Sequence, residues 1–508
     1  MITTRKGQKT MKIKLGILAA LLAGSFGAAG GPAGDCGLAQ AEWKLGTHSC
    51  LEERDGKRLL VVEVPEKDRN GSYLSRAEID LSPFRGLPTT FSMRVRIDGI
   101  EKEAGRKGIK FMVTYQAPSG AGIWHGGWGI YGPADWRSVS FLSPIDDYTG
   151  KAELVLGVEK NFGKVEFDLD SFRAENHFDL DQSSARAVYT DRVLKEKRLR
   201  GVMSPGGNMT EDDFRTLREW GANLVRFQMQ RLYQDCTDLD AYGRWLKGRL
   251  DHFEKLTEIA PHYGIRLILD LHSAPGGRRS DSAELLMLHS EEYAQYFVRI
   301  WEEIARRFKG NPAVFAYDLV NEPYQTGAAR FDYLELQKRA AEAIRRIDPE
   351  VPIIVEANQL AAPVAFRYFR LLELPNIVYQ AHMYVPESFT HQNTPGSRYP
   401  GVISGIEWNK EQLRHTLEPV RRFQQRHGAR IYIGEFSAKT WAPGAERYIA
   451  DCISLFEEYG WDWSYHAFRE ARSWNVELEG TQEKTVPSAD NPRKKALLEG
   501  LGKNLVTP

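Results

Sequence analysis

The stretch NPAVFAYDLVNEPYQ, from Asn311 to Gln325, joins an apolar run to an abrupt polar end. Val314 to Val320 has the length and composition of a short buried strand, whereas Asn321, Glu322 and Pro323 stop that pattern at once. A carboxylate is costly to bury without a partner. The stretch therefore predicts a hidden strand that opens at its carboxyl end into a polar space.

Similar apolar strands recur from Leu199 onward, and amphipathic helical patterns such as EYAQYFVRIWEEIARRFKG separate most of them. The eight strand candidates are RLRGVMS, NLVRFQ, IRLILDLH, VFAYDLVNE, PIIVEA, NIVYQAHMY, RIYIGEF and WDWSYHAF. Eight strands that alternate with helices predict a (β/α)8 TIM barrel over residues 199–508. A doubly wound sheet is the alternative, but no Gly-rich phosphate loop follows any strand.

Residues 42–178 follow a different rhythm, in which segments such as RLLVVEVPE and TFSMRVRIDGI alternate apolar and polar residues with period two. Turn residues separate these segments, so we predict an antiparallel β-sandwich. Residues 179–198 are charged and irregular and are predicted to be a linker. The Gly-rich segment around Trp124, Trp128, Tyr131 and Trp136 predicts either a flat platform for sugar rings or packing against the next domain.

The composition narrows the class of partner. The chain has 508 residues, with 68 Lys and Arg against 68 Asp and Glu, so its formal charge is zero. This balance argues against nucleic acid or an anionic membrane as partner, because either would favour a basic stripe. The length predicts two or three domains. We expect a monomer.

The N-terminus has the layout of a secretory signal. Lys12 and Lys14 precede the apolar run LGILAALLAGSFGAAG, and Met11 could be the true start. An AQA site before Glu42 makes residues 1–41 the predicted leader, and the apolar run is too short to favour a membrane span. We therefore predict a secreted or periplasmic protein; a lipoprotein anchor at Cys36 is disfavoured because Asp35 precedes it.

The cysteines predict neither a metal site nor a disulfide framework. Cys50, Cys236 and Cys452 remain if the leader is removed, and their spacing fits no metal site. One disulfide is possible, but isolated buried thiols are the simpler interpretation. No metal and no cofactor is expected, since no set of His, Asp and Cys has ligand spacing.

Polar side chains gather at the carboxyl ends of the predicted strands, which converge on one face of a barrel. They are Arg226, His272, Asn321, Glu322, His382, Tyr384 and Glu435. Two carboxylates on opposite sides of a site are the minimum equipment for hydrolysing a glycosidic bond, one protonated and one ionised. Either glutamate alone is as simply explained as a salt-bridged strand end. The full set favours glycoside hydrolysis.

VNEP at Val320–Pro323, together with IGEF at Ile433–Phe436, resembles glycoside hydrolase family 5, the retaining β-glycanases of cellulase type. The segments VRF, DLHSAPGG and HMY support the resemblance in the family's order. It implies that Glu322 is the acid/base and Glu435 the nucleophile. It further implies that Asn321 binds the sugar 2-hydroxyl, that Arg226 and Tyr384 orient Glu435, and that His272 and His382 line the cleavage point. The sandwich looks like a jelly-roll carbohydrate-binding module, at fold level only.

The end of the eighth strand departs from the family, which usually places a Trp there as the floor of the −1 subsite. The segment WDWSYHAFREARSWNVE offers Trp463, His466, Phe468 and Trp474, of which Phe468 and Trp474 are the predicted platform candidates. Three functions stay open: a β-1,4-glucanase, a mannanase or exo-acting β-glucosidase or β-1,3-glucanase on the same scaffold, and a non-catalytic glycan-binding protein. The glutamates at both strand ends argue against the last.

Overall fold

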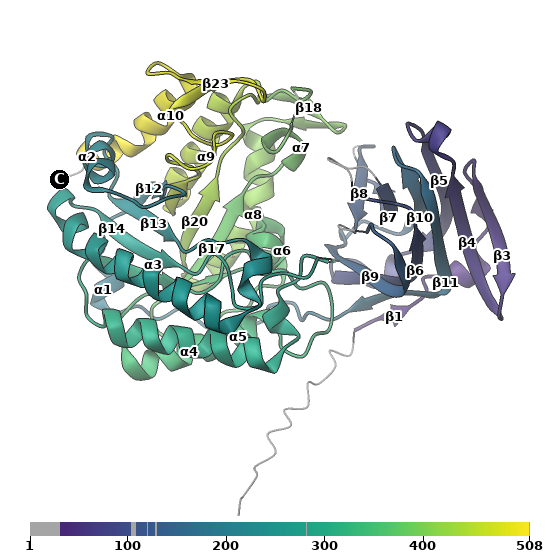
Figure 1. Cartoon of the computed structure of the whole chain (residues 1–508), viewed down its shortest axis with the longest axis horizontal. Helices are drawn as coiled ribbons and strands as arrows, with labels where there is room; N and C mark the ends of the chain where they lie inside the picture. Colours follow the sequence, from purple (N-terminus) through teal and green to yellow (C-terminus); the bar gives the residue numbers. More distant parts are fainter. Residues whose placement is uncertain are drawn as a thin grey trace, which may run out of the picture.

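The computed structural model describes residues 31–102, 108–118, 120–127, 130–280, 282–393 and 395–506. An antiparallel β-sandwich lies beside a closed eight-stranded barrel, as predicted (Figure 1). The predicted leader lies mostly outside the described residues, as does Trp128. Within the described ranges, no helix combines the length and apolarity that a membrane crossing needs.

Two sheets form the sandwich. One has the order β3 (Ser49–Arg54), β4 (Lys57–Val64), β11 (Gly163–Asn176), β6 (Pro88–Asp98) and β9 (Ala134–Pro144), with β1 (Ala33–Gly34) paired to β11. The other has the order β2 (Trp43–Lys44), β5 (Ser72–Asp80), β10 (Lys151–Glu159), β7 (Gly108–Gln116) and β8 (Gly122–Gly126). Alternate residues such as Leu154, Leu156 and Val158 fill the core between them.

The sandwich begins earlier than residue 42, where the sequence predicted its start. Ala33 pairs with Glu175 of β11, and Leu38 is buried in the sandwich core. Cleavage after Ala41 would remove these contacts, whereas a leader ending before Ala33 leaves them intact.

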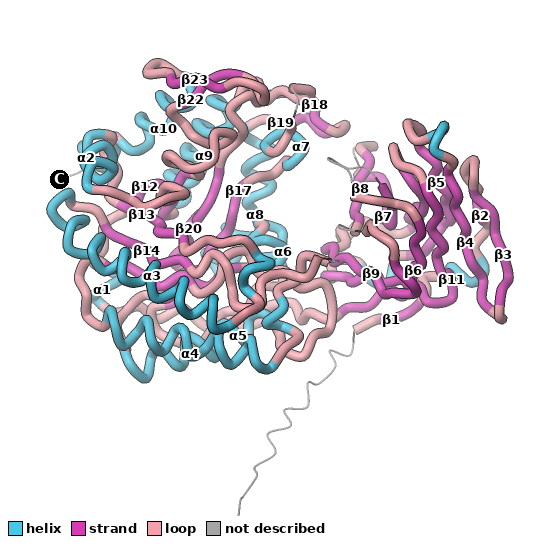
Figure 2. Tube along the Cα trace, viewed as in Figure 1, coloured by secondary structure: helices cyan, strands magenta, loops and turns pink. Residues whose placement is uncertain are grey.

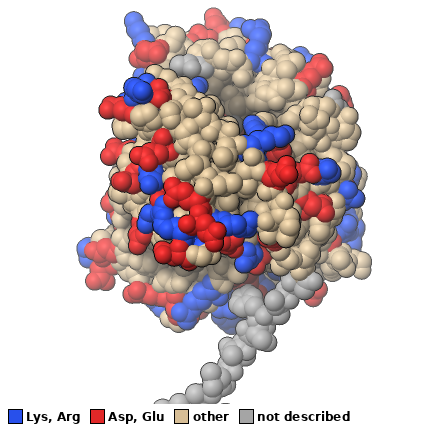
Figure 3. Space-filling model, turned by 90° about the vertical axis from the view of Figure 1, so that its right-hand side faces the viewer, with Lys and Arg blue, Asp and Glu red and all other residues tan. Residues whose placement is uncertain are grey.

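Figure 3 shows the outer face of the sandwich, at the β3 end of the molecule. Basic and acidic side chains are mixed over this face, without a large patch of either sign.

Parallel strands close the barrel in sequence order, ringed by helices (Figure 2). The strands are β12 (Arg200–Met203), β13 (Leu224–Gln228), β14 (Arg266–Asp270), β15 (Val314–Asp318), β16 (Ile353–Glu356), β17 (Ile377–Met383), β20 (Arg430–Phe436) and β21 (Asp462–Tyr465). The main helices are α2 (Glu211–Glu219), α3 (Leu239–Ile259), α4 (Glu291–Phe308), α5 (Tyr333–Ile347), α8 (Lys410–His427), α9 (Ala445–Tyr459) and α10 (Pro492–Leu501). Side chains of Asp238, Ser290 and Asp332 cap α3, α4 and α5.

Shorter elements complete the chain. The 3-10 helices are η1 (Leu38–Gln40), η2 (Glu66–Asp68), η3 (Ser82–Phe84), η4 (Tyr233–Cys236), η5 (Ala260–Tyr263), η6 (Leu286–Leu288) and η7 (Pro363–Arg367). The short α-helices are α1 (Asp191–Leu194), α6 (Asn358–Ala361), α7 (Glu387–Thr390) and α11 (Lys503–Val506). Two hairpins pair β18 (Gly401–Ile403) with β19 (Ile406–Trp408) and β22 (Leu478–Gly480) with β23 (Thr485–Pro487).

The barrel interior changes from apolar to charged along its axis. One layer of buried side chains is apolar and comes from Leu199, Leu224, Ile268, Phe315, Ala316, Ile354, Val378 and Tyr432. Side chains in a strand alternate between two faces, so the residue two positions later points to the same interior. Those residues include Arg226, Asp270, Asp318 and Glu356. The period of two thus places a charged layer directly above the apolar one.

The sandwich is joined to the barrel by packing and by polar contacts. Leu142 of β9 and Phe178 belong to the same buried cluster as the barrel core. The hydroxyls of Ser140 and Thr326 lie 2.7 Å apart, and the Gln359 side chain donates to the Leu142 carbonyl at 3.0 Å. Thr326 lies four residues after Glu322, so the sandwich braces the loop that carries the predicted acid.

The predicted linker lies against the barrel rather than spanning a gap. The Ala187 amide donates to the carbonyl of His427, and the Tyr189 hydroxyl donates to the carbonyl of Ile377. His427 itself bonds Asp181, with 2.6 Å between Nε2 and Oδ2. These contacts fix the segment along the barrel.

The cysteines agree only in part with the interpretation as isolated buried thiols, because Cys50 is exposed. All four are unpaired, and Cys236 and Cys452 are buried. Burial raises the pKa of Cys236 to about 11, which keeps that thiol protonated and unreactive.

Candidate active site

Glu322 lies just beyond the end of β15, where the buried run of Val314 to Val320 stops. Its backbone is left-handed, with φ of 51°, a conformation that residues other than glycine seldom adopt. Two contacts hold it there: the Glu322 amide donates to Glu356 at 2.8 Å, and Arg278 donates to the Glu322 carbonyl at 2.7 Å. The strained turn aims a side chain that is 24% exposed away from the barrel core.

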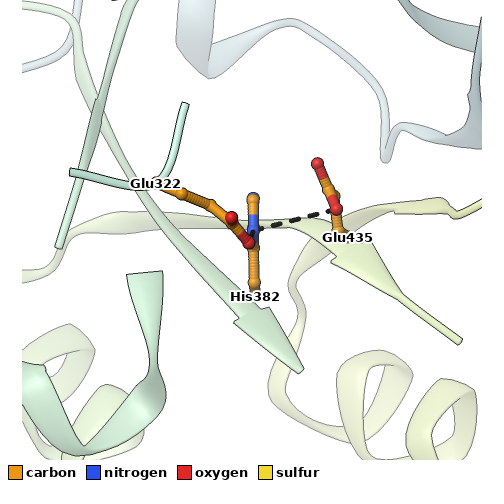
Figure 4. Close-up of side chains that lie close together, drawn as sticks. All are labelled: Glu322, His382 and Glu435. Atoms are coloured by element: carbon orange, nitrogen blue, oxygen red, sulfur yellow. Dashed lines mark hydrogen bonds and ion pairs between the residues drawn. The ribbon is translucent and has the colours of Figure 1, made fainter. Parts of the chain in front are cut away.

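Glu435, at the end of β20, faces Glu322 with His382 between them (Figure 4). His382 Nδ1 lies 3.0 Å from Glu322 Oε1 and 4.0 Å from Glu435 Oε2. One carboxylate oxygen of each glutamate and the histidine nitrogen all lie within 4.8 Å of one another. The two acids predicted from distant motifs are therefore neighbours across a small space.

Both oxygens of Glu435 are already engaged by donors. Arg226 Nη1 lies 2.8 Å from Oε1, and the Tyr384 hydroxyl donates to Oε2 at 2.8 Å. Burial alone would raise the pKa of Glu435, but the nearby His382, His466 and Arg226 hold it far below its usual range. Glu435 is therefore an ionised carboxylate, fixed in place and only 7% exposed.

Arg226 is fully buried and bonds several acids at once. Its Nε donates to Asp318 at 2.8 Å and its Nη2 to Glu356 at 2.9 Å, while Asp270 lies at 3.3 Å. Burial alone would lower the pKa of Arg226, but these carboxylates raise it well above its usual value. Burial raises the pKa of Asp318 to about 6 and that of Glu356 well above its usual range.

Sequence reasoning missed three of the acids around Arg226. Asp270, Asp318 and Glu356 occur inside the apolar runs LILDL, AYDLV and IIVEA, whose composition is that of ordinary strands. The available signal was their position two residues beyond an interior apolar side chain. That period places them in the barrel interior, where a buried charge requires a partner.

The other predicted polar residues gather around the same centre. His272 Nδ1 lies 2.8 Å from Asp270, and its Nε2 lies 3.3 Å from the Asn321 amide nitrogen. The Asn321 oxygen accepts from Arg226 at 3.1 Å. Burial would lower the pKa of His272, but the charge of Asp270 raises it. Arg226, His272, Asn321, His382 and Tyr384 are thus all brought together with the two glutamates.

The two platform candidates after β21 have different surroundings. Phe468 is fully buried and meets the Trp220 ring edge-on at 5.3 Å, so it offers no open face to a sugar. Trp474 is partly exposed, and its ring centre lies 5.8 Å from Tyr384 and 5.3 Å from His466. Only Trp474 therefore borders the site. Trp463 is a core residue.

His466 directly follows β21 and belongs to the site; the sequence named it only as one of four residues after the last strand and did not choose it as a platform candidate. Its Nδ1 lies 2.7 Å from the Tyr384 hydroxyl, and its Nε2 lies 3.0 Å from Glu470. Glu470 was missed as well. A polar pair spaced by four residues after the last strand was the signal available, but it is weak without knowing the path of the loop.

The aromatic residues of the Gly-rich segment in the sandwich differ in their surroundings, and their predicted role as a sugar platform stays a prediction. Trp124 on β8 is 50% exposed, and Arg76 lies over its ring. The Tyr131 hydroxyl, by contrast, donates to the Ser280 carbonyl of the barrel at 3.4 Å. Trp136 has the cations of Lys57, Arg94 and Arg96 over its ring. Tyr131 thus contacts the barrel, whereas Trp124 is half-exposed with Arg76 over its ring.

Glu322, His382 and Glu435 are the one group of three among the described residues that could chelate a metal ion. Arg226 and Tyr384 already occupy both oxygens of Glu435. The guanidinium thus supplies the positive charge that a cation would bring. The donor set suits an ionised nucleophile better than a metal ligand.

Comparison with known proteins agrees with the glycoside hydrolysis that the two facing glutamates indicate. Residues 190–471, more than half of the chain, match the cellulase family, glycosyl hydrolase family 5. The chain belongs to this family. It is a glycoside hydrolase, and its barrel with two facing glutamates is the family 5 catalytic domain.

Named relatives of this family 5 enzyme include endoglucanase C of Acetivibrio thermocellus, which is 29% identical over 291 residues, covering 51% of this chain and 84% of the relative. Cellodextrinase A of Ruminococcus flavefaciens is 25% identical over 234 residues, covering 44% of this chain and 68% of the relative. A crystal structure described as a glycoside hydrolase aligns with a TM-score of 0.49 and 25% identity, covering 60% of this chain and 99% of that one.

Proposed function

We propose that this family 5 enzyme hydrolyses β-1,4-linked glucan with retention of configuration, using Glu435 as nucleophile and Glu322 as acid/base. The observation that carries the proposal is the spacing of the two acids, whose nearest oxygens lie within 4.8 Å. Retaining glycosidases keep their carboxyl groups about 5–5.5 Å apart, whereas inverting enzymes need about 6.5–9.5 Å to admit a water. The relatives named endoglucanase and cellodextrinase support a β-glucan as substrate.

In the first step a Glu435 oxygen forms a bond to the anomeric carbon while the bond to the leaving oxygen breaks. Glu322 gives its proton to that oxygen, so the departing sugar leaves as an alcohol. Arg226 and Tyr384 hold Glu435 by one oxygen each, which fixes the direction of attack. His382, 3.0 Å from Glu322, orients the acid toward the same space.

In the second step a water attacks the anomeric carbon of the glycosyl-enzyme from the side that the leaving group vacated. Glu322, now ionised, takes a proton from that water, and Glu435 is released as a carboxylate. Asn321 lies next to the acid and offers an amide to the sugar 2-hydroxyl. His272 borders the cleavage point, and Trp474 supplies the ring surface against the −1 sugar.

Stereochemistry and a rescue experiment test this assignment. Proton NMR during hydrolysis of cello-oligosaccharides should show the β-anomer first. Glu435→Ala should lose nearly all activity, and azide should restore turnover of an aryl β-glycoside with an α-glycosyl azide as product. An α-anomer as first product would contradict retention. Near-normal turnover by Glu435→Ala would reject the nucleophile.

A panel of β-glucans, mannan and aryl glycosides, with products separated by size, tests the substrate. Mixed oligosaccharides from β-1,4-glucan support the proposal, and release of single sugars would favour exo action. Binding without hydrolysis across the panel would favour a glycan-binding protein. We also propose export: the mature N-terminus found in the culture medium or periplasm should lie upstream of Ala33.

A further inference from the structure

A chain of hydrogen bonds runs from Glu470 through His466 and Tyr384 to Glu435. Glu470 Oε2 lies 3.0 Å from His466 Nε2, and His466 Nδ1 lies 2.7 Å from the Tyr384 oxygen. That hydroxyl lies in turn 2.8 Å from Glu435 Oε2. The three bonds connect the loop after β21 to the carboxylate at the end of β20.

The number of protons fixes the direction of every bond in this chain. Tyr384 has one hydroxyl proton, and the ionised Glu435 can only accept, so that proton points to Glu435. The Tyr384 oxygen is then an acceptor, and His466 Nδ1 must carry a proton. Glu470 is also a carboxylate that accepts, so Nε2 must carry one too. All three bonds form together only when His466 is an imidazolium.

We propose that His466, held by Glu470, is a positioning residue that obliges Tyr384 to direct its hydroxyl proton to the nucleophile Glu435. The inference rests on the proposed role of Glu435. When His466 loses the proton on Nδ1, the ring nitrogen becomes an acceptor and competes for the Tyr384 proton. Glu435 then keeps Arg226 but loses its second donor, so its orientation is no longer fixed.

The surroundings of His466 favour the charged ring. Burial would lower the pKa of His466, but the charges of Glu470, Glu435 and Glu322 raise it. Burial would raise the pKa of Glu470, but His466 lowers it, so the pair is ionic. The Trp474 ring lies 5.3 Å from the imidazole and shields it on one side.

His391 provides a matched control, because it is a second histidine beside Tyr384. Its ring centre lies 5.0 Å from that of Tyr384, yet its Nδ1 bonds Thr390 at 2.9 Å instead of the Tyr384 hydroxyl. Burial lowers the pKa of His391 to about 4, so this ring is neutral throughout the working pH range. Replacement of His391 tests the effect of crowding near Tyr384. It leaves intact the chain of hydrogen bonds from Glu470 through His466 and Tyr384 to Glu435, which we call the relay.

The kinetic test measures the pH dependence of kcat/KM for Glu470→Gln, with His391→Gln as control. Loss of the Glu470 charge should move the alkaline limb to lower pH by roughly one unit, while the acid limb stays in place. His466→Gln should lower kcat roughly ten-fold, the worth of one hydrogen bond to a charged group, and should lose that titration. A uniform loss of activity in Glu470→Gln without movement of the alkaline limb would reduce the pair to a structural role.

A readout without turnover separates this inference from the proposed function. The full chain, with nitrogen-15 in its histidines, is titrated by NMR, and His466→Gln assigns the signal. His466 should keep both ring nitrogens protonated at pH 7, and Glu470→Gln should lower its midpoint. A ring that is neutral at pH 7 would overturn the relay even in an active enzyme. A charged ring in a protein that cleaves no glycan would leave the relay in place and reject the function.

Discussion

Arg226 Nη1 lies 2.8 Å from Glu435 Oε1, although 209 residues separate the two along the chain. The same guanidinium bonds Asp318 and Glu356, so one side chain both orients the proposed nucleophile and bonds buried acids. Catalysis and stability are therefore coupled at this point.

Arg226→Met should destabilise the fold. The substitution keeps much of the volume but leaves Asp270 and Asp318 buried without their counter-charge and Glu356 without its donor, which costs about 3–5 kcal/mol for a broken buried pair. Urea denaturation measures the free energy of unfolding. Arg422→Met is the control, because its pair with Glu418 is exposed and should contribute less than about 0.5 kcal/mol. Equal losses in the two variants would show that Arg226 does not stabilise the buried acids.

Tyr384→Phe should lower kcat by roughly ten-fold or more and change KM little. The hydroxyl donates to Glu435 at 2.8 Å, and its loss frees the nucleophile to rotate. Steady-state kinetics on a soluble β-glucan measures both constants. Tyr399→Phe also removes a buried hydroxyl, but one that donates to Asp451 at 2.9 Å, and it should leave kcat unchanged. A rise in KM alone would place Tyr384 in substrate binding.

Glu322→Ala should discriminate between leaving groups. Natural glycans need a proton on the departing oxygen, whereas a nitrophenolate leaves without one. We expect a loss of roughly 100-fold or more on glucan and a much smaller loss of the first step on a dinitrophenyl glycoside. Pre-steady-state release of the phenol provides the measurement. Equal losses on both substrates would contradict the acid role.

Trp474→Ala and Phe468→Leu should affect different quantities. Trp474 is partly exposed beside Tyr384, so its loss should lower kcat/KM by roughly ten-fold through lost ring contact with the sugar. Phe468 packs on Trp220 in the core, so its replacement should lower the free energy of unfolding and leave kcat/KM close to normal. The reverse pattern would make Phe468 the sugar platform.

Glu457 should contribute stability that depends on pH. Arg200 of β12 donates to both of its oxygens at 2.8 Å, which ties α9, the helix that carries Glu457, to the first barrel strand. Burial would raise the pKa of Glu457, but Arg200 and Trp463 lower it. A depressed folded pKa stabilises above the unfolded value near 4.3, and that stability is lost as pH falls through the folded value.

Glu457→Gln should therefore be less stable than the wild type at pH 7, and the difference should shrink toward pH 3. Unfolding curves across that range test the sign. Glu458→Gln is the control, because its pair with Arg414 is more exposed than the pair of Glu457 with Arg200 and should contribute less to stability. A difference that grows as pH falls would contradict the linkage.

Much of the site could be predicted from the sequence. All strands of a parallel barrel run in the same direction, and their side chains alternate with a period of two, so the positions of many side chains are constrained. The polar residue that ends each apolar run must emerge at one face, which brings Glu322, Glu435 and Arg226 together whatever their spacing in the chain. Asp270 and Glu356 could not be predicted in this way. Each lies inside an apolar run, and its role exists only because neighbouring strands direct it toward one arginine.

The relay escaped prediction for a different reason. His466 and Glu470 are four residues apart but lie in a loop, where Arg469 has a left-handed φ of 50°. Periodic patterns carry no information about such a turn. Likewise Leu38 follows a leader-like segment, and only the pairing of Ala33 with β11 shows that this part belongs to the sandwich.

The contact between Leu142 and the barrel core sets a lower limit on the smallest working enzyme. The family match begins at residue 190. A protein shortened to that residue would lose Leu142 and Phe178, and the apolar barrel surface that they cover would be exposed to water. Thr326, four residues after the proposed acid Glu322, would lose its hydrogen bond with Ser140 at the same time. The sandwich therefore helps to hold the barrel and the loop of Glu322 in place, independently of any binding to glycan.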